Sequence, residues 1–541
     1  MLEVVEALLE VTSNHFLNFS ILISKFLKLL LTLLLLFHYN VNGQYGYYTD
    51  VLKFSHYFNG GSARIEGIGG ATSSLGGDIS STSINPAGLG FFNKKVFSIG
   101  YKSMIKKNTS SYLGESSYFD SSFDKINNVS IVLPVRKRSG FTRDAVFECK
   151  DCPKFNIGIS HNVLKNFRNE RYYRGYNDNN SIIDYFLYDA QGIPLSQISN
   201  SQPISGIGLL QEAYDHYLIN PSSDLPGSYF SFVGGYPLQE ERVSNDGSLS
   251  KFSISAGLNF NDKFYMGLGS NIYFLNYRQT RFFQENNYEI INDNGEWEFE
   301  GILDYLILRD SFKITGNGSS LSFGMIFKPI NELNIGFNYE SKTKYLLNEE
   351  YDSELETSYF DYYFQPEDTV LGSSVSGTAL NVAEYNFTSP SKFTIGASYF
   401  IKKNGFISVD VDFINYTSSS LQSSDFDTYR DNQEIRNIYK TLAVNYRFGV
   451  EGRFDNFYIR AGYNFLADPN RIKDIIDNGL IKKSLGIGYL VKSLNIDLSY
   501  SSINSKSNIT PYPIYSNQPV AEFTTKHQVI KLTLGIRINN R

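Results

Sequence analysis

The sequence contains little cysteine, no excess of positive charge and almost no long apolar runs. Two cysteines among 541 residues are too few for a disulfide-rich scaffold. Lysine and arginine number 49 against 55 acidic residues, a net charge of −6, so we expect no nucleic-acid partner. One long apolar run and a mean hydropathy of −0.25 exclude a bundle of membrane helices. Aromatic residues, however, make up 15% of the chain and glycine contributes 43 residues, which favours a large β-barrel.

The one long apolar run lies near the N-terminus. Residues 16–37 are almost all apolar, Lys25 and Lys28 interrupt them, and a small residue, Gly43, precedes Gln44. A secretory signal peptide contains positive charge, a short apolar core and a small residue before the cleavage site. We therefore predict a signal peptide over residues 1–43. The alternative is a single membrane anchor, which would need roughly 20 uninterrupted apolar residues.

Strand-like alternation recurs through the body of the chain, residues 94–541. In residues 530–538, leucines and isoleucines at every second position oppose Lys531, Thr533 and Gly535. This period predicts strands with one apolar face. About fourteen such segments occur, most of them at least as long as the ~9–11 residues of a tilted membrane strand. We predict an all-β fold, a transmembrane antiparallel β-barrel in the bacterial outer membrane.

The connections between these segments alternate between short and long. In outer-membrane barrels the short turns face the periplasm and the long loops face outward. Lipid cannot satisfy a free strand edge, so the sheet is expected to close on itself. Long loops are predicted at 105–125, 167–248, 280–313, 347–387, 418–439, 467–479 and 505–523.

Residues 44–93 break the strand pattern. This segment contains many glycines, including the pairs Gly69-Gly70 and Gly76-Gly77, together with many serines and alanines. Such a sequence bends freely and packs tightly. Because it precedes the first strand, it starts on the periplasmic side, and we predict that it folds back into the barrel as a hatch. The alternative is a flexible periplasmic tail.

Residues 59–92 resemble the N-terminal hatch of the FadL/TodX family of outer membrane transport proteins, particularly its Bacteroidetes branch. The resemblance is carried by the Gly-Gly-Ser-Ala-Arg run at 60–64, the two glycine pairs, and the tripeptide Asn85-Pro86-Ala87, which matches the family's hatch tripeptide. It implies a fourteen-stranded barrel with an N-terminal hatch, in agreement with the strand count.

The resemblance also implies a function. Members of the family pass hydrophobic compounds, such as long-chain fatty acids or aromatic hydrocarbons, across the outer membrane without direct energy input. The expected partners are a hydrophobic small-molecule ligand, outer-membrane lipids and, during biogenesis, the barrel-assembly machinery. The chain ends in Asn539-Asn540-Arg541, whereas many such barrels end in an aromatic residue that this machinery reads. The alternative function is a non-transport barrel in protein secretion or surface attachment.

The sequence offers no constellation for catalysis or metal binding. No two histidines outside the leader have metal-ligand spacing, and neither a nucleophile elbow nor a phosphate loop occurs. We therefore expect no enzyme activity, no metal and no cofactor. Cys149 and Cys152 are predicted to form a local disulfide rather than a redox pair. His216 is expected to be solvated in the long loop.

Charged residues share the polar face of three neighbouring strands. Asp410, Asp412, Arg447 and Arg460 point into the lumen if the apolar face contacts lipid. We expect Arg447 and Asp410 to lie at similar height. Three roles are open for these charges: a ladder that stiffens the wall, a site for the polar head of a ligand, or an anchor for the hatch.

The long loop 167–248 contains one helical pattern. Ile207, Leu210, Tyr214 and Leu218 recur at helical spacing and build one apolar stripe, and Asn220-Pro221 is expected to end the helix. The helix is predicted either to pack on neighbouring loops at the barrel mouth or to form an outer docking surface for an apolar ligand.

Overall fold

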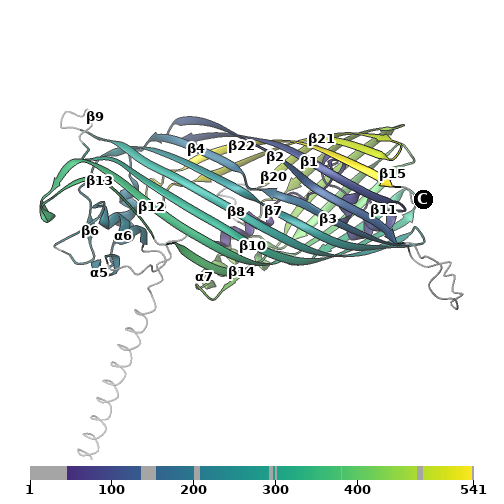
Figure 1. The fold of residues 1–541 in the computed structure, drawn as a ribbon, viewed down its shortest axis with the longest axis horizontal. Coiled ribbons are helices and arrows are strands. Elements are labelled where there is room, and N and C mark those ends of the chain that lie inside the picture. Colours follow the sequence, from purple (N-terminus) through teal and green to yellow (C-terminus); the bar gives the residue numbers. More distant parts are fainter. Residues whose placement is uncertain are drawn as a thin grey trace, which may run out of the picture. The chain divides into compact units, whose positions relative to one another are not determined.

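The computed structural model describes residues 46–135, 154–199, 208–223, 225–291, 297–298, 301–378, 380–471 and 479–538. The predicted signal peptide and the cysteine pair lie outside these ranges. Fourteen strands form the wall, each antiparallel to the next, and the last pairs with the first, so the sheet is closed. The wall strands run side by side in Figure 1. They are β1 (Lys95–Tyr112), β2 (Glu115–Val135), β3 (Lys154–Asn166), β7 (Tyr236–Phe260), β8 (Phe264–Ile291), β10 (Leu303–Ile330), β11 (Leu333–Glu340), β15 (Lys392–Ile401), β16 (Gly405–Ile414), β18 (Ala443–Phe454), β19 (Phe457–Leu466), β20 (Leu480–Val491), β21 (Leu494–Ile509) and β22 (Ala521–Ile538).

Alternation places apolar side chains on the outside of the wall and small or polar ones inside. On β20, Leu485 and Ile487 are 62% and 58% exposed, whereas Ser484 is buried. Ile530 and Leu534 are likewise exposed on β22 on either side of the buried Lys531. A band of exposed apolar side chains around a closed barrel is the surface that lipid covers.

The wall extends well beyond the membrane at the end that carries the long loops. Here β7, β8 and β10 are 25, 28 and 28 residues long, against ~9–11 for a spanning strand. This extension contains β4 (Asn169–Tyr176), β12 (Lys344–Phe364), β13 (Thr369–Gly377), β14 (Asn381–Thr388) and β17 (Ser420–Ser423), with the short strands β5 (Asn220–Pro221), β6 (Tyr229–Phe230) and β9 (Trp297–Glu298).

Several of the predicted long loops are therefore wrong in large part. β1 and β2 continue through residues 105–125 to a tight turn at Leu113-Gly114, where both residues have positive φ. Residues 280–313 and 347–387 also belong mostly to strands. Beyond the lipid bilayer, neither face of a strand has to be apolar. The alternation of apolar and polar residues that identifies a membrane strand is therefore lost there, although the hydrogen bonds between the strands continue.

The described helices are short, and none is part of the wall sheet. The N-terminal part contains η1 (Tyr47–Thr49), α2 (Asp50–Ser55), α3 (Ala63–Gly67), η2 (Ile79–Thr82) and η3 (Pro86–Phe91). The loop end contains α4 (Ile182–Ala190), α5 (Leu195–Ile198), α6 (Gly208–Asp215), η4 (Gln365–Glu367), η5 (Tyr416–Ser418) and α7 (Tyr429–Ile438). In the described ranges, no helix is both long and apolar enough to cross a membrane.

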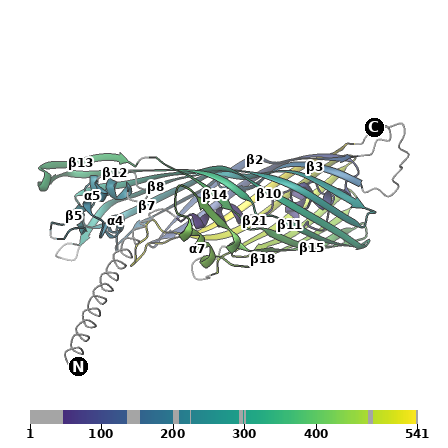
Figure 2. The ribbon, with the colours of Figure 1, turned by 90° about the horizontal axis from the view of Figure 1, so that it is seen from below.

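Residues 46–93, which we call the hatch segment, lie among the wall strands in both views (Figure 1, Figure 2). Side-chain caps organise the segment locally. Asn85 is extended, as a residue before proline must be, and its side chain accepts a hydrogen bond from Ala87 N at the start of η3. Its amide donates to Ser73 O and to Phe337 O of β11. Asn85 thus joins two parts of the hatch segment to the wall.

Candidate functional site

The hatch segment contacts the wall most closely at paired glycines. Three pairs of lumen-facing glycines stand directly opposite each other on adjacent strands: Gly257–Gly267, Gly336–Gly396 and Gly449–Gly462. A Cβ atom at Gly449 would lie 2.6 Å from Ile68 O, and one at Gly257 would lie 2.8 Å from Pro86 O. These distances are well inside ordinary contact, so only glycine lets the two backbones approach this closely.

A buried cluster of three charges holds the middle of the hatch segment. Asp410 Oδ2 accepts hydrogen bonds from Thr72 N at 2.9 Å, Ser73 N at 3.0 Å and Ser73 Oγ at 2.8 Å. Arg447 donates to the same oxygen at 3.3 Å and to both oxygens of Asp412 at 2.7 Å. Asp410 therefore accepts from the hatch segment and from the wall together.

A second cluster lies beside the first. Arg460 donates to Glu451 and to Asp497, in both cases at 2.8 Å. From the hatch segment, Arg64 donates to Glu451 at 2.9 Å and lies 3.6 Å from Asp78. Charged groups buried in this way are stable only when they are paired.

The structure thus places all four predicted lumen residues inside the barrel, buried and in two clusters. Their charged groups bind one another and, through Asp410, the hatch segment. Of the three roles left open by the sequence, this geometry matches the anchor best, because Arg447 and Arg460 are already paired with carboxylates. A role in binding a ligand's head group stays a prediction.

A cluster of buried aromatic side chains in the lumen, which we call the aromatic chamber, surrounds the first part of the hatch segment, and sequence reasoning missed it. The helix α2 lies inside it, with Val51 and Phe54 only 0% and 1% exposed. Aromatic rings present much apolar surface with few conformations, which suits an apolar ligand. The buried rings around α2 are Phe167, Tyr273, Tyr277, Tyr345, Tyr385, Phe387, Tyr416 and Tyr439.

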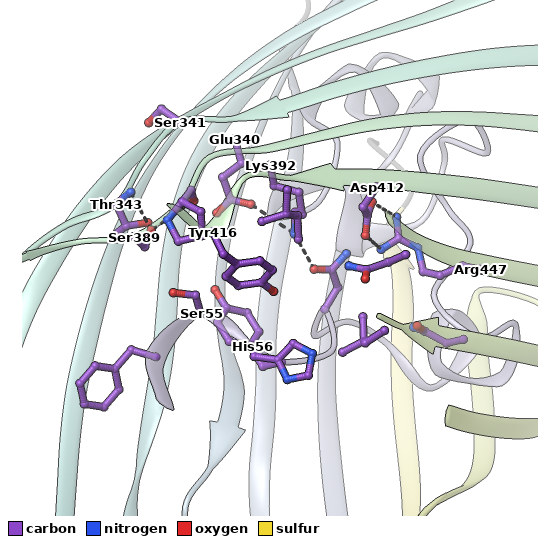
Figure 3. Close-up of a pocket in the computed structure, with 18 residues that line it drawn as sticks. Ser55, His56, Glu340, Ser341, Thr343, Ser389, Lys392, Asp412, Tyr416 and Arg447 are labelled. Atoms are coloured by element: carbon purple, nitrogen blue, oxygen red, sulfur yellow. Dashed lines mark hydrogen bonds and ion pairs between the residues drawn. The ribbon is translucent and has the colours of Figure 1, made fainter. Parts of the chain in front are cut away.

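A small polar cavity adjoins the chamber, as Figure 3 shows. Tyr416 and His56 border it, and Lys392 and Arg447 line its polar side. Lys392 Nζ donates to Asn59 Oδ1 of the hatch segment at 2.8 Å. Burial lowers the pKa of His56 to about 3, so its imidazole is neutral. The cavity, about 50 Å³, has room for water molecules but not for an acyl chain.

The loop helix differs from its prediction. It ends at Asp215, before Asn220-Pro221, because Tyr217 adopts a positive φ. Leu210 and Leu218 are 2% and 0% exposed, and Tyr214 is half-buried, so the stripe packs inside the loop region and is not an open docking surface. Ile207 lies outside the described residues.

His216 is buried rather than solvated. Its ring nitrogens lie 2.8 Å from Thr357 Oγ1 and 2.7 Å from Ser376 Oγ, and burial lowers its pKa to about 4. Within the described ranges, no group of three histidine, cysteine or acidic side chains is placed to hold a metal ion.

A closed antiparallel barrel with an apolar outer band and a polar, filled lumen is the architecture of a bacterial outer-membrane β-barrel protein. Among solved structures, the chain is similar to a Pseudomonas aeruginosa FadL homologue, with a TM-score of 0.51 and 14% identity over 89% of this chain and 99% of that one. It is also similar to the toluene transporter TodX of Pseudomonas putida, with a TM-score of 0.46 and 11% identity over 89% and 99%.

The first of these structures confirms the predicted fourteen-stranded barrel. No protein-family model matches the sequence, and no curated protein matches it. The similarity therefore concerns the barrel fold alone.

Proposed function

We propose that this protein carries hydrophobic small molecules across the outer membrane by passive diffusion. The observation that carries the proposal is the aromatic chamber inside the barrel, which α2 of the hatch segment fills. The hatch resemblance supports it, and so do the names of the similar structures, a FadL homologue and a toluene transporter. Long-chain fatty acids and aromatic hydrocarbons are the candidate substrates.

The hatch segment is proposed to close the lumen as a plug. Its contacts with β7, β11, β16 and β18 bring the chain across the inside of the barrel. The cavity beside α2 is too small for an apolar ligand, so passage requires α2 to leave the chamber. Transport then needs no catalytic group, which accords with a channel rather than an enzyme.

Uptake assays test the proposal. Cells with and without the protein are given labelled toluene or labelled oleate. We expect faster uptake with the protein. The variant Leu421→Asn should abolish this increase, because it places a polar amide in the aromatic chamber, where Leu421 is only 3% exposed. The matched control is Leu380→Asn, at a side chain that is 60% exposed.

Equal uptake with and without the protein would contradict transport. If a second protein also co-purified with the barrel, the alternative of secretion or surface attachment would take its place. Folding of Leu421→Asn is checked by its mobility on a gel before and after boiling, since a folded barrel migrates differently from the unfolded chain.

A further inference from the structure

The extension of the wall has one sheet edge that its own strands cover only in part. At this edge β13 and then β14 pair with β12, on the side of β12 that faces away from β10. β14 is covered, because β17 pairs with residues 385–388 and the side chains of Ser423 and Asp425 hydrogen-bond to the backbone of Glu384. Within the described ranges, β13 pairs with β12 alone. β13 can be followed beside β12 in Figure 1 and Figure 2.

Alternate residues of β13 direct their backbone groups away from β12. Thr378 N donates to Ser353 O at 2.8 Å, so these two residues form a hydrogen-bonded pair of the antiparallel ladder. Bonded and non-bonded pairs alternate along such a ladder, so Ser373, Val375 and Gly377 each turn an N–H and a C=O to the open side. No group in the described part of the chain bonds to these outward atoms. The edge therefore offers a row of free backbone donors and acceptors.

The sequence of this edge contains none of the usual protection. Natural proteins protect exposed strand edges with lysine, proline, bulges or a covering loop. Residues 369–383 contain neither a charged residue nor a proline, and Val370 and Val375 are 58% and 57% exposed. An uncharged edge with exposed β-branched side chains is suited to pairing with a further strand.

The surroundings of the edge are strongly acidic. Residues 344–388, which include β12, β13 and β14, contain nine acidic residues and one lysine, a net charge of −8 compared with −6 for the whole chain. Arg309 and Lys313 of β10 pair with three of these carboxylates. Beside the start of β13, the exposed Glu367 and Asp368 accept hydrogen bonds from tyrosines. A strand that docks here meets negative charge, which favours a basic strand.

We propose that the free edge of β13 is a docking site for an extended, basic segment of another protein. The segment adds a strand to the extension: its backbone bonds to the outward groups of Ser373, Val375 and Gly377, and its lysine or arginine side chains pair with the neighbouring carboxylates. A second copy of this chain would bring the same negative charge to the edge, so a partner of opposite charge is favoured. The site lies outside the lumen, and the inference does not depend on transport.

The decisive variant is Val375→Pro. Proline has no N–H, and at this position only an outward N–H is lost, so the hydrogen bonds between β13 and β12 stay in place. Val375→Thr is the matched control, because threonine also branches at Cβ and keeps the N–H. Folding of both variants is checked by gel mobility before and after boiling.

Binding is measured by the fluorescence anisotropy of a labelled synthetic peptide, added to the purified protein in neutral detergent. The probe is a peptide of about nine residues, the length of a typical strand, in which lysines alternate with valines and threonines. We expect Val375→Pro to bind it roughly tenfold more weakly than the wild type, as the loss of one or two hydrogen bonds implies. Val375→Thr should bind it as the wild type does.

Two altered probes test the chemistry without changing the protein. A probe with N-methyl groups on alternate amides cannot donate to the edge, so it should bind the wild type much more weakly. A probe with glutamate in place of lysine should also bind more weakly, and added salt should reduce the difference between the two, because salt screens exposed charges.

Several outcomes would overturn the inference. If Val375→Pro binds the lysine probe as tightly as the wild type, the peptide binds elsewhere. If the N-methylated probe binds as well as the unmodified one, the edge is not recognised through its backbone. Equal binding of the lysine and glutamate probes would remove the basic partner. Dimers of the wild type in sedimentation, lost in Val375→Pro, would show that the edge joins two copies instead.

Discussion

Replacing Gly449 by alanine is expected to loosen the hatch segment from the wall. Gly449 faces the lumen on β18, opposite Gly462 of β19. An added Cβ atom would lie 2.6 Å from Ile68 O and 2.9 Å from Ile68 Cβ. Ordinary contact at such a position begins at 3.4 Å, so the overlap is 3.4 − 2.6 = 0.8 Å. Either the wall or the hatch segment has to move by about that amount.

We expect the hatch segment to move rather than the wall. β18 is hydrogen-bonded along its length to β16 on one side and to β19 on the other, whereas Ile68 lies directly after the short helix α3. Overpacking of a filled interior costs about 1–3 kcal/mol. This cost falls on the contact between hatch segment and wall rather than on the barrel, because the barrel's ladder is unchanged.

Conductance of single proteins in planar lipid bilayers measures the effect. Gly449→Ala should conduct ions more often or more strongly than the wild type, in the direction of a variant that lacks residues 48–90. Gly535→Ala is the control: it places the same methyl group on the lumen face of β22, where the nearest atom, Asn495 Cβ, would be 3.6 Å away. Its conductance should equal that of the wild type.

Two results would refute this reasoning. If Gly449→Ala melts at a lower temperature but conducts like the wild type, the wall gives way and the hatch segment stays in place. If neither quantity changes, the two backbones are not as close as the paired glycines indicate.

Three further predictions follow from charge and burial. Arg447→Met leaves two buried carboxylates without their cation and should cost about 3–5 kcal/mol in a thermal melt; adding Asp412→Leu should recover part of the loss. Leu485→Arg, in the outer band, should cost about 2–4 kcal/mol near the bilayer centre in a urea titration followed by gel mobility, whereas Ser374→Arg on the extension should cost much less. Burial lowers the pKa of His216 from 6.5 to about 4, so between these pH values only the unfolded loop takes up a proton, and the loop loses stability as the pH falls from 6.5 towards 4. Hydrogen exchange of residues 208–218, corrected for intrinsic rates, should show this loss in the wild type and not in His216→Gln.

The sequence predicts the membrane part of the barrel well, because lipid imposes a rule there. Each strand must turn an apolar face outward, so period-two alternation appears wherever the wall crosses the bilayer. Leu485 and Ile487 of β20 obey this rule. No such rule acts on the extension, and β7 begins at Tyr236 inside a region expected to be a long loop.

The lumen is less predictable from the sequence, because its side chains contact a segment that is far away in the sequence. Asp410 and Arg447 could be placed on the inner face, but the partner of Asp410 is the backbone at Thr72 and Ser73, which no periodicity shows. The aromatic chamber left only a weak signal in the sequence, the tyrosines and phenylalanines at the start of the hatch segment, such as Tyr47 and Phe54.

The lysines that contact Glu66, Lys482 and Lys531, left a clearer signal in the sequence than the aromatic chamber did. Lys531 alternates with apolar residues in the last strand, and a charged residue on a lumen face invites a search for its partner. The groups that Lys531 contacts, the carboxylate of Glu66 and the carbonyl of Gly61, lie in the hatch segment, far away in the sequence.

The seam between β1 and β22 fixes the order in which the molecule can be completed. Lys95–Ser111 pair with Glu522–Ile538. The hatch segment is hydrogen-bonded to the same last strand: Ala63 N donates to Thr533 Oγ1 and Lys531 Nζ donates to Gly61 O, both at 2.8 Å. The hatch segment precedes every wall strand in the chain, yet it gains these contacts only when the last strand, β22, is in place. A chain cut short before β22 would keep both an open edge and an unseated hatch segment.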